Sequence, residues 1–152
     1  MAKFYFNGAD TIAASFQDLA NLTPEDTLNI LRPAAQLLME AQKAKEKSTF
    51  TQRSGSLYNS IKLEERIGET GAAIRVHIVG KHPNAYTGRR MKDGRPSGRY
   101  SGSNAEVAYI LEQGSPRISP RYWIETTNEE NEEAVNAAMG EAWDAYLTEK
   151  GL

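Results

Sequence analysis

The sequence predicts an α+β fold in which a small, mainly antiparallel β-sheet is packed on one face by an N-terminal helix and a C-terminal helix. Two long segments, 24–47 and 127–150, have apolar side chains at helical spacing. Between them, residues 61–67 and 74–79 alternate apolar and polar side chains, as in strands with one buried face. A chain of 152 residues can bury a sufficient hydrophobic core without disulfides or a structural metal, so we expect residues 1–152 to form a single domain.

The first long helix has a clear start and one internal irregularity. Thr23 can cap it, and Pro24 suits the first helical position, where an N–H is not needed. Pro33 lies well inside the same apolar stripe, where it removes one backbone hydrogen bond and crowds the preceding turn. We therefore predict a kinked helix, with a kink or break at residues 31–33.

The remaining elements follow from alternation and turn residues. The sequence between the two alternating segments, Gly68-Glu69-Thr70-Gly71, predicts a β-hairpin. Residues 105–112 also alternate, which favours a third strand and leaves a short helix open. Thr127 or Asn128 is the expected N-cap of the last helix, and Gly151 its end. Before the first helix, Phe4-Tyr5-Phe6 indicates a short strand, and residues 12–19 one or two helical turns.

Residues 81–104 differ in composition from the rest of the chain. They are rich in glycine, serine and proline with few aliphatic side chains, which predicts a long mobile loop. The loop has six basic residues against one aspartate, a local charge of +5 in a chain whose net charge is −2. Three interpretations stay open: contact with nucleic-acid phosphates, docking to an acidic protein surface, or a solvated loop without function. The candidate DNA or partner contacts are Arg89, Arg90, Lys92, Arg95 and Arg99.

No pattern of residues indicates catalysis, a cofactor or a metal. His77 and His82 lack the helical i, i+4 spacing of a metal site, and the chain has no cysteine. The glycines of the basic loop do not match the spacing of phosphate-binding loops. We therefore expect no catalytic residue, no cofactor and no bound metal, and a protein that is not an enzyme. Nowhere do 18 apolar residues follow one another, so we expect no membrane partner.

Two groups near the last helix are candidate interface residues. Tyr122 and Trp123 follow Pro120, and such an aromatic pair favours core packing against the last helix while leaving an interface anchor open. Acidic residues crowd the first turns of that helix, a pattern typical of a solvated helix start that also complements the basic loop. The candidates in this group are Glu129, Glu130 and Glu133.

The order of these signals resembles the neck, or tail-completion, family of long-tailed bacteriophages, which includes head-tail joining and minor tail proteins. The resemblance spans about residues 28–147. After an alanine-containing amphipathic helix come Ser54-Gly55-Ser56-Leu57-Tyr58-Asn59-Ser60-Ile61, a hairpin, Ala108-Tyr109-Ile110-Leu111-Glu112-Gln113-Gly114-Ser115, and Ser119-Pro120-Arg121-Tyr122-Trp123-Ile124. The chain departs from the family pattern at Ser54, where threonine is usual, at Tyr122-Trp123, and in its longer basic loop.

This resemblance implies a structural virion protein, assembled in the host cytoplasm, that forms a ring between the head connector and the tail tube. Its implied partners are other copies of the chain, phage connector and tail proteins, and, through non-specific contact, the DNA in the channel. An acidic last helix and a basic loop on one subunit suit a head-to-tail contact between neighbours. The alternative is a small nucleic-acid-binding module that uses the basic loop 81–104.

Overall fold

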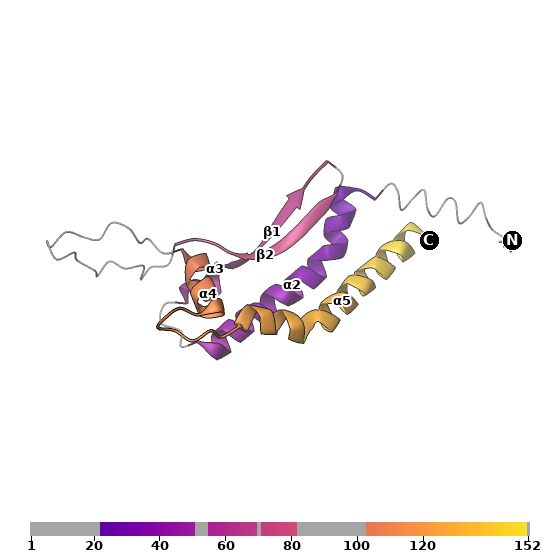
Figure 1. The fold of residues 1–152 in the computed structure, drawn as a ribbon. Coiled ribbons are helices and arrows are strands. Elements are labelled where there is room, and N and C mark those ends of the chain that lie inside the picture. Colours follow the sequence, from indigo (N-terminus) through magenta and orange to yellow (C-terminus); the bar gives the residue numbers. More distant parts are fainter. Residues whose placement is uncertain (1–21, 51–54, 70, 82–102, 152) are drawn as a thin grey trace, which may run out of the picture.

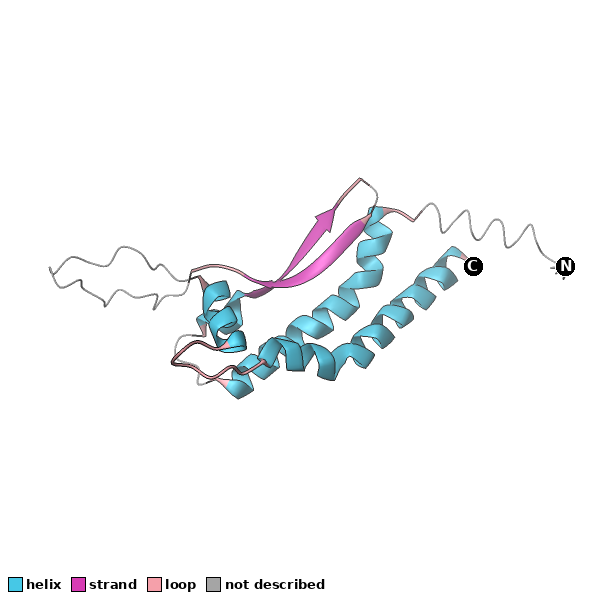
Figure 2. Ribbon diagram, in the orientation of Figure 1, coloured by secondary structure: helices cyan, strands magenta, loops and turns pink. Residues whose placement is uncertain are grey.

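Two long helices lie side by side, and a two-stranded hairpin packs against the first of them (Figures 1 and 2). The computed structural model describes residues 22–50, 55–69, 71–81 and 103–151. Along the chain the elements are α2 (Pro24–Thr49), α3 (Ser56–Ser60), β1 (Ile61–Ile67), β2 (Ala72–Ile78), α4 (Asn104–Gln113) and α5 (Trp123–Lys150). The predicted α+β class is confirmed. The strand and helical turns expected within residues 4–19 lie outside the described residues.

Helix α2 begins where its capping residues predict. The Thr23 hydroxyl accepts the N–H of Asp26 at 3.1 Å, and the Asp26 carboxylate accepts the Thr23 N–H at 3.1 Å. The helix continues through Pro33 without interruption, so the alternative of a break there is wrong, and Figure 1 shows a continuous ribbon whose axis changes direction after its first turns. Leu28, Ile30 and Ala34 are buried on both sides of the proline, so packing holds the two parts in one helix.

The hairpin forms in the predicted place. Strands β1 and β2 are antiparallel, with Ile61 opposite Ile78 and Leu63 opposite Val76. The N–H of Gly68 donates to the carbonyl of Gly71 at 2.8 Å and closes the turn. Since side chains alternate across a strand, the apolar members of both strands share the face that packs on α2.

The third predicted strand is wrong, because residues 104–113 form helix α4. The Ser103 hydroxyl caps this helix by accepting the Glu106 N–H at 3.0 Å. Its buried residues are Asn104, Ala108 and Glu112, which lie one helical turn apart on one face. Two of these three residues are polar, so the spacing of apolar side chains alone does not indicate a helix here.

Helix α5 begins four residues before the predicted cap Thr127. That residue lies inside the helix, 1% exposed, and its hydroxyl donates to the carbonyl of Trp123. The predicted end is confirmed, because Gly151 adopts a left-handed conformation with φ 75° and donates to the carbonyls of Leu147 and Thr148. Among residues 123–151, only Trp123 and Thr127 are buried. Most of α5 therefore lies on the surface of this subunit.

The core gathers where α3, β1, α4 and the start of α5 meet. Its buried members are Leu57, Ile61, Ala108 and Trp123, and partly buried side chains of α2 and β2 pack around them. The rings of Phe50 and Trp123 meet edge to face, with centroids 5.9 Å apart. Away from this cluster the described apolar residues of the α2–α5 seam are mostly half-buried.

A charged link joins α2 to β1 and predicts a pH dependence. Arg32 bonds both carboxylate oxygens of Glu65, at 2.8 and 3.0 Å, and these hydrogen bonds lower the pKa of Glu65. A lowered pKa gives stability that is present above the unfolded value, about 4.3, and is lost as pH falls through the folded value. We expect Glu65→Gln to lower the urea midpoint at pH 7, and the difference from wild type to shrink as the pH falls below about 4.3.

The matched control is Glu141→Gln, which removes an exposed carboxylate of α5. We expect this variant to stay close to wild type at both pH values, since isolated surface substitutions have small effects. A difference between wild type and Glu65→Gln that is the same at pH 3 and pH 7 contradicts the assigned link.

Candidate assembly surface

Glu112 connects α4 to the start of α5. Its carboxylate is buried, and its two oxygens accept the backbone N–H groups of Ile124 and Glu125 at 2.8 and 2.9 Å. Those N–H groups belong to the first turn of α5. The side chain of the N-cap residue, Tyr122, makes no hydrogen bond to this turn. A negative charge at a helix N-terminus also complements the helix dipole. Glu112 thus caps α5 from another helix.

Removing this cap should cost more than removing an ordinary one, because it leaves two N–H groups without their charged acceptor. We expect Glu112→Ala to lower the free energy of unfolding by about 2–4 kcal/mol, measured by urea denaturation. Glu112→Gln keeps the shape and one acceptor oxygen, so its loss should be smaller. An alanine variant within about 0.5 kcal/mol of wild type would show that water replaces the carboxylate without penalty.

Gly114 lets the chain turn sharply after Glu112. It has φ 80° and ψ −178°, a conformation nearly confined to glycine. A Cβ at this position would lie 2.8 Å from the carbonyl oxygen of Ile118 and 2.9 Å from Pro120. The Glu-x-Gly pair therefore has two structural roles, a cap and a close backbone crossing.

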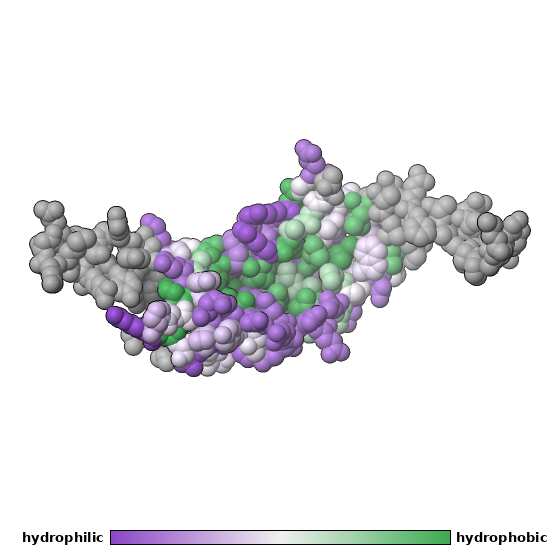
Figure 3. Space-filling model, viewed as in Figure 1, coloured by the Kyte–Doolittle hydropathy of each residue, from purple (hydrophilic) through white to green (hydrophobic). Residues whose placement is uncertain are grey.

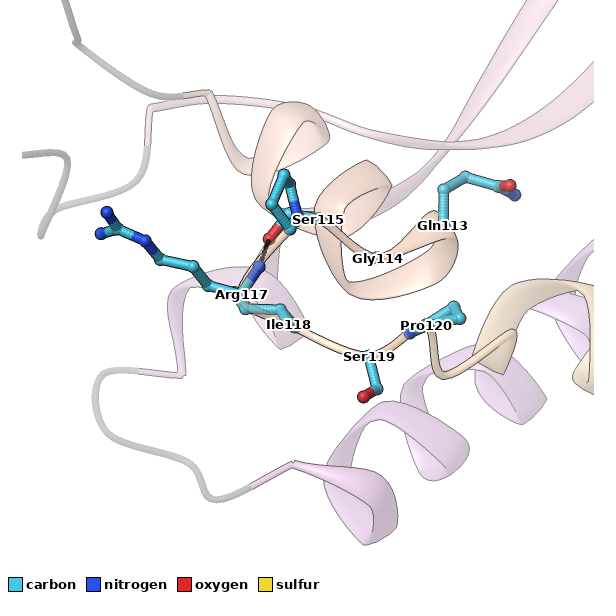
Figure 4. Close-up of a pocket in the computed structure, with 8 residues that line it drawn as sticks. Gln113, Gly114, Ser115, Arg117, Ile118, Ser119 and Pro120 are labelled. Carbon is cyan, nitrogen blue, oxygen red and sulfur yellow. Dashed lines mark hydrogen bonds between the residues drawn. The ribbon is translucent and has the colours of Figure 1, made fainter.

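The turn after Gly114 is tight and presents polar groups outward. The N–H of Ser115 donates to the carbonyl of Ile118 at 2.7 Å, and the N–H of Ile118 donates back at 3.1 Å. Residues 113–120 line a surface hollow, and Figure 4 shows the side chains of Gln113 and Arg117 extending in opposite directions. Among the described residues that line this hollow there is no carboxylate and no histidine.

The aromatic pair divides between core and surface. Trp123 is 0% exposed, so its prediction as an interface residue is wrong. It lies in the core as the first residue of α5 and packs on Leu57, Ile61 and Ala108, not against the last helix as expected. Tyr122 is 47% exposed and has a left-handed backbone with φ 47°. It lies beside exposed Arg121 and close in sequence to Ile118, which is 42% exposed. Only Tyr122 of the pair is available to a partner.

Several hydrogen bonds hold together the two ends of the predicted basic loop. Asn104, buried, donates from its side chain to the carbonyl of Val79 at 2.9 Å and accepts the Ser56 hydroxyl at 3.0 Å. Its N–H bonds the carbonyl of Gly80 at 3.0 Å, and Lys81 forms a β-bridge with Ser103. The two points where the described chain leaves and returns are therefore adjacent. The contacts predicted at Arg89, Arg90, Lys92, Arg95 and Arg99 lie outside the described residues.

The predicted acidic residues lie on the exposed side of α5. Glu129 and Glu133 are exposed, and Glu130 is exposed while pairing with Lys45 of α2 at 2.9 Å. Glu130 is thus partly engaged within its own subunit. Over the whole helix, eight acidic residues stand against the single Lys150, and all eight are exposed. We call this surface the acidic ridge; it consists of Glu125, Glu129, Glu130, Glu132, Glu133, Glu141, Asp144 and Glu149.

An apolar groove lies between the hairpin and the two long helices. Its volume is about 550 Å³, and a second hollow of about 340 Å³ shares Leu38 and Asn128 with it and continues along α5. Figure 3 shows an apolar band over the middle of this face, with polar atoms on both sides. The main apolar side chains lining the groove are Leu38, Ile74, Val76, Ile78, Tyr109 and Ile124. Sequence reasoning missed it because four separate elements form it.

The described part of the chain contains no cluster of side chains suited to a metal ion and no helix able to cross a bilayer. No protein-family model, curated protein sequence or solved structure matches this chain.

Proposed function

We propose that this chain is a structural virion protein of the bacteriophage head–tail junction, which assembles into a ring between the head connector and the tail tube. The sequence motifs described above suggest this role, and one structural observation carries it. The acidic ridge of α5 is exposed along the whole helix, while segment 81–104 contains six of the chain's eighteen basic residues and a single acidic one. Asn104 holds the two ends of this segment together through its bonds to Val79 and Gly80. One subunit therefore has an exposed acidic helix and, elsewhere in its sequence, a segment of opposite charge.

Unlike surfaces favour a head-to-tail contact between copies. A contact in which one surface meets a different surface of the next copy closes into a ring when its rotation permits. Charged groups of this kind set orientation and association rate more than affinity, and salt weakens them. In this arrangement the ridge around Glu129 and Glu133 meets the basic segment of a neighbour, and the protein acts by assembly without catalysis.

A charge-exchange experiment tests the proposal. We expect the purified protein to form rings visible by electron microscopy, and Glu129→Lys with Glu133→Lys to abolish them. Combining those changes with Arg89→Glu and Arg90→Glu should restore rings. The matched control, Glu149→Lys, removes an acidic residue near the other end of α5 and should leave rings intact. A chain that stays monomeric at all protein and salt concentrations contradicts the proposal.

The second candidate is a nucleic-acid-binding module, favoured by the local charge of +5 in residues 81–104. Duplex binding through several of these residues should weaken with salt, with a log–log slope of about −0.9 for each phosphate contacted. The two candidates predict complexes of different composition, protein alone or protein with nucleic acid. Ring formation in the absence of nucleic acid supports assembly, whereas a monomer that binds duplex with this slope supports the module.

A further inference from the structure

The outer edge of strand β2 has backbone groups without partners among the described residues. The bonds Val79 N–H to Ser60 carbonyl (2.9 Å) and Gly68 N–H to Gly71 carbonyl (2.8 Å) lie at the two ends of the ladder and set the same phase. In an antiparallel pair, alternate residues bond the neighbouring strand and the others point away from it. Ile74, Val76 and Ile78 therefore direct their N–H and carbonyl groups outward.

These outward-pointing groups lie beside the apolar groove. Ile74, Val76 and Ile78 line the groove with their side chains and remain only half-buried. Such an edge, with apolar side chains and unpaired backbone, is a template for one more strand. Residues 104–113, where the sequence favoured a third strand, form helix α4 beside the groove, so they do not pair with that edge.

We infer that the outer edge of β2 and its groove receive strand β1 of a second copy, so that hairpins join into a continuous antiparallel sheet. This inference rests on the proposed assembly into a ring. The outer edge of β1 supplies the matching half, because the same ladder phase directs the backbone groups of Leu63, Glu65 and Ile67 outward. Both strands have seven residues, and each subunit offers one edge of each kind.

Charge distinguishes this pairing from β2 against β2. The polar face of β2 carries Arg75 and His77, and the strand Ala72–Ile78 has no acidic residue. Two β2 strands would bring basic groups together, which disfavours a symmetric pair. Strand β1 carries Glu64, which already pairs with Arg75 of its own chain. In the register that repeats the one within the chain, this carboxylate also lies opposite Arg75 of the neighbour. Ile67, 63% exposed in the subunit, then lies opposite Ala72 of the neighbour.

Disulfide trapping tests the pairing. Because the chain has no cysteine of its own, only the introduced cysteines can form a disulfide. Arg75→Cys and Glu64→Cys are made in separate chains and mixed under oxidising conditions. In the inferred pairing these positions form a non-hydrogen-bonded pair, whose short Cα separation suits a disulfide. We expect a covalent dimer in the mixture and little in either variant alone. A dimer of Arg75→Cys alone would mean β2 against β2, which overturns the inference.

Hydrogen exchange and a proline variant provide a second readout. On assembly, the amides of Ile74, Val76 and Ile78 should exchange at least about tenfold more slowly. Ile74→Pro removes an outward N–H that the fold does not use, so it should weaken self-association at least about tenfold. Its matched control, Ile74→Ala, loses the side chain but keeps the N–H, and should assemble more tightly than the proline variant.

The outcomes separate this inference from the proposed function. Rings that form with no bond between positions 64 and 75 and no added amide protection would overturn the inference and leave ring assembly standing. Protection that persists in a monomer and is lost when residues 1–9 are deleted would assign the edge to the chain's own N-terminal segment, and also overturns it. A chain that never self-associates contradicts both.

Discussion

Trp123→Ala is expected to lower the free energy of unfolding by about 3–5 kcal/mol, the largest effect of any single side chain considered. The indole is fully buried among Leu57, Ile61 and Ala108 and meets the Phe50 ring edge to face. Its loss removes apolar contacts and leaves a cavity where α5 joins three other elements. Urea denaturation followed by circular dichroism gives the loss, since the substitution removes one of the chain's two tryptophans and so changes its fluorescence.

Two matched variants identify the cause. The indole N–H has no hydrogen-bond partner among the described residues, so Trp123→Phe loses volume but no hydrogen bond. We expect a smaller loss for it, about 1–2 kcal/mol. Tyr122→Ala changes the adjacent, exposed aromatic and should stay within about 0.5 kcal/mol of wild type. Equal losses for Tyr122→Ala and Trp123→Ala would contradict the division of this pair between surface and core.

Gly114→Ala should lower the free energy of unfolding by about 3 kcal/mol or more, because two costs combine. Alanine is strained at φ 80°, and its Cβ would lie within 3 Å of backbone atoms of Ile118 and Pro120. Both neighbours belong to the main chain, so the turn must move to make room. That movement also displaces Glu112 from the N–H groups it caps.

The same substitution elsewhere gives the control. Gly140 lies inside α5, exposed, and a Cβ there would meet nothing within 4 Å. Alanine has a higher helix propensity than glycine, so Gly140→Ala should raise the free energy of unfolding by about 0.5–1 kcal/mol. Opposite signs for the two glycines, read from urea midpoints, are the expected result. A harmless Gly114→Ala would mean that residues 113–120 adopt a different turn in solution.

Local signals predicted the elements whose causes are local. The cap at Thr23 and the turn at Gly68–Gly71 act within a few residues, and both are confirmed. The start of α5 was misplaced because its cap is Glu112, eleven residues before Trp123, on another helix. Residues 105–112 alternate like a strand, yet the buried face Asn104, Ala108 and Glu112 makes them a helix.

The candidate interface divides in the same way. The sequence indicates that acidic residues gather on the last helix, and solvent exposure of Glu129 and Glu133 agrees with it. It does not indicate that Trp123 is buried while Tyr122 is exposed, since that depends on which side of the turn faces Phe50. The groove beside β2 also escapes prediction, because its wall comes from α2, β2, α4 and α5 together.

The sequence by itself determined the α+β class, the hairpin with its apolar and polar faces, and the segregation of charge. Periodicity, turn residues and side-chain charge are properties of short stretches. Only the tertiary structure decided that Glu112 caps α5, that Asn104 closes the base of the basic segment, and that no strand among the described residues pairs with the outer edge of β2. Each of these depends on atoms from elements far apart in the chain, whose meeting is set by how the helices pack on the sheet.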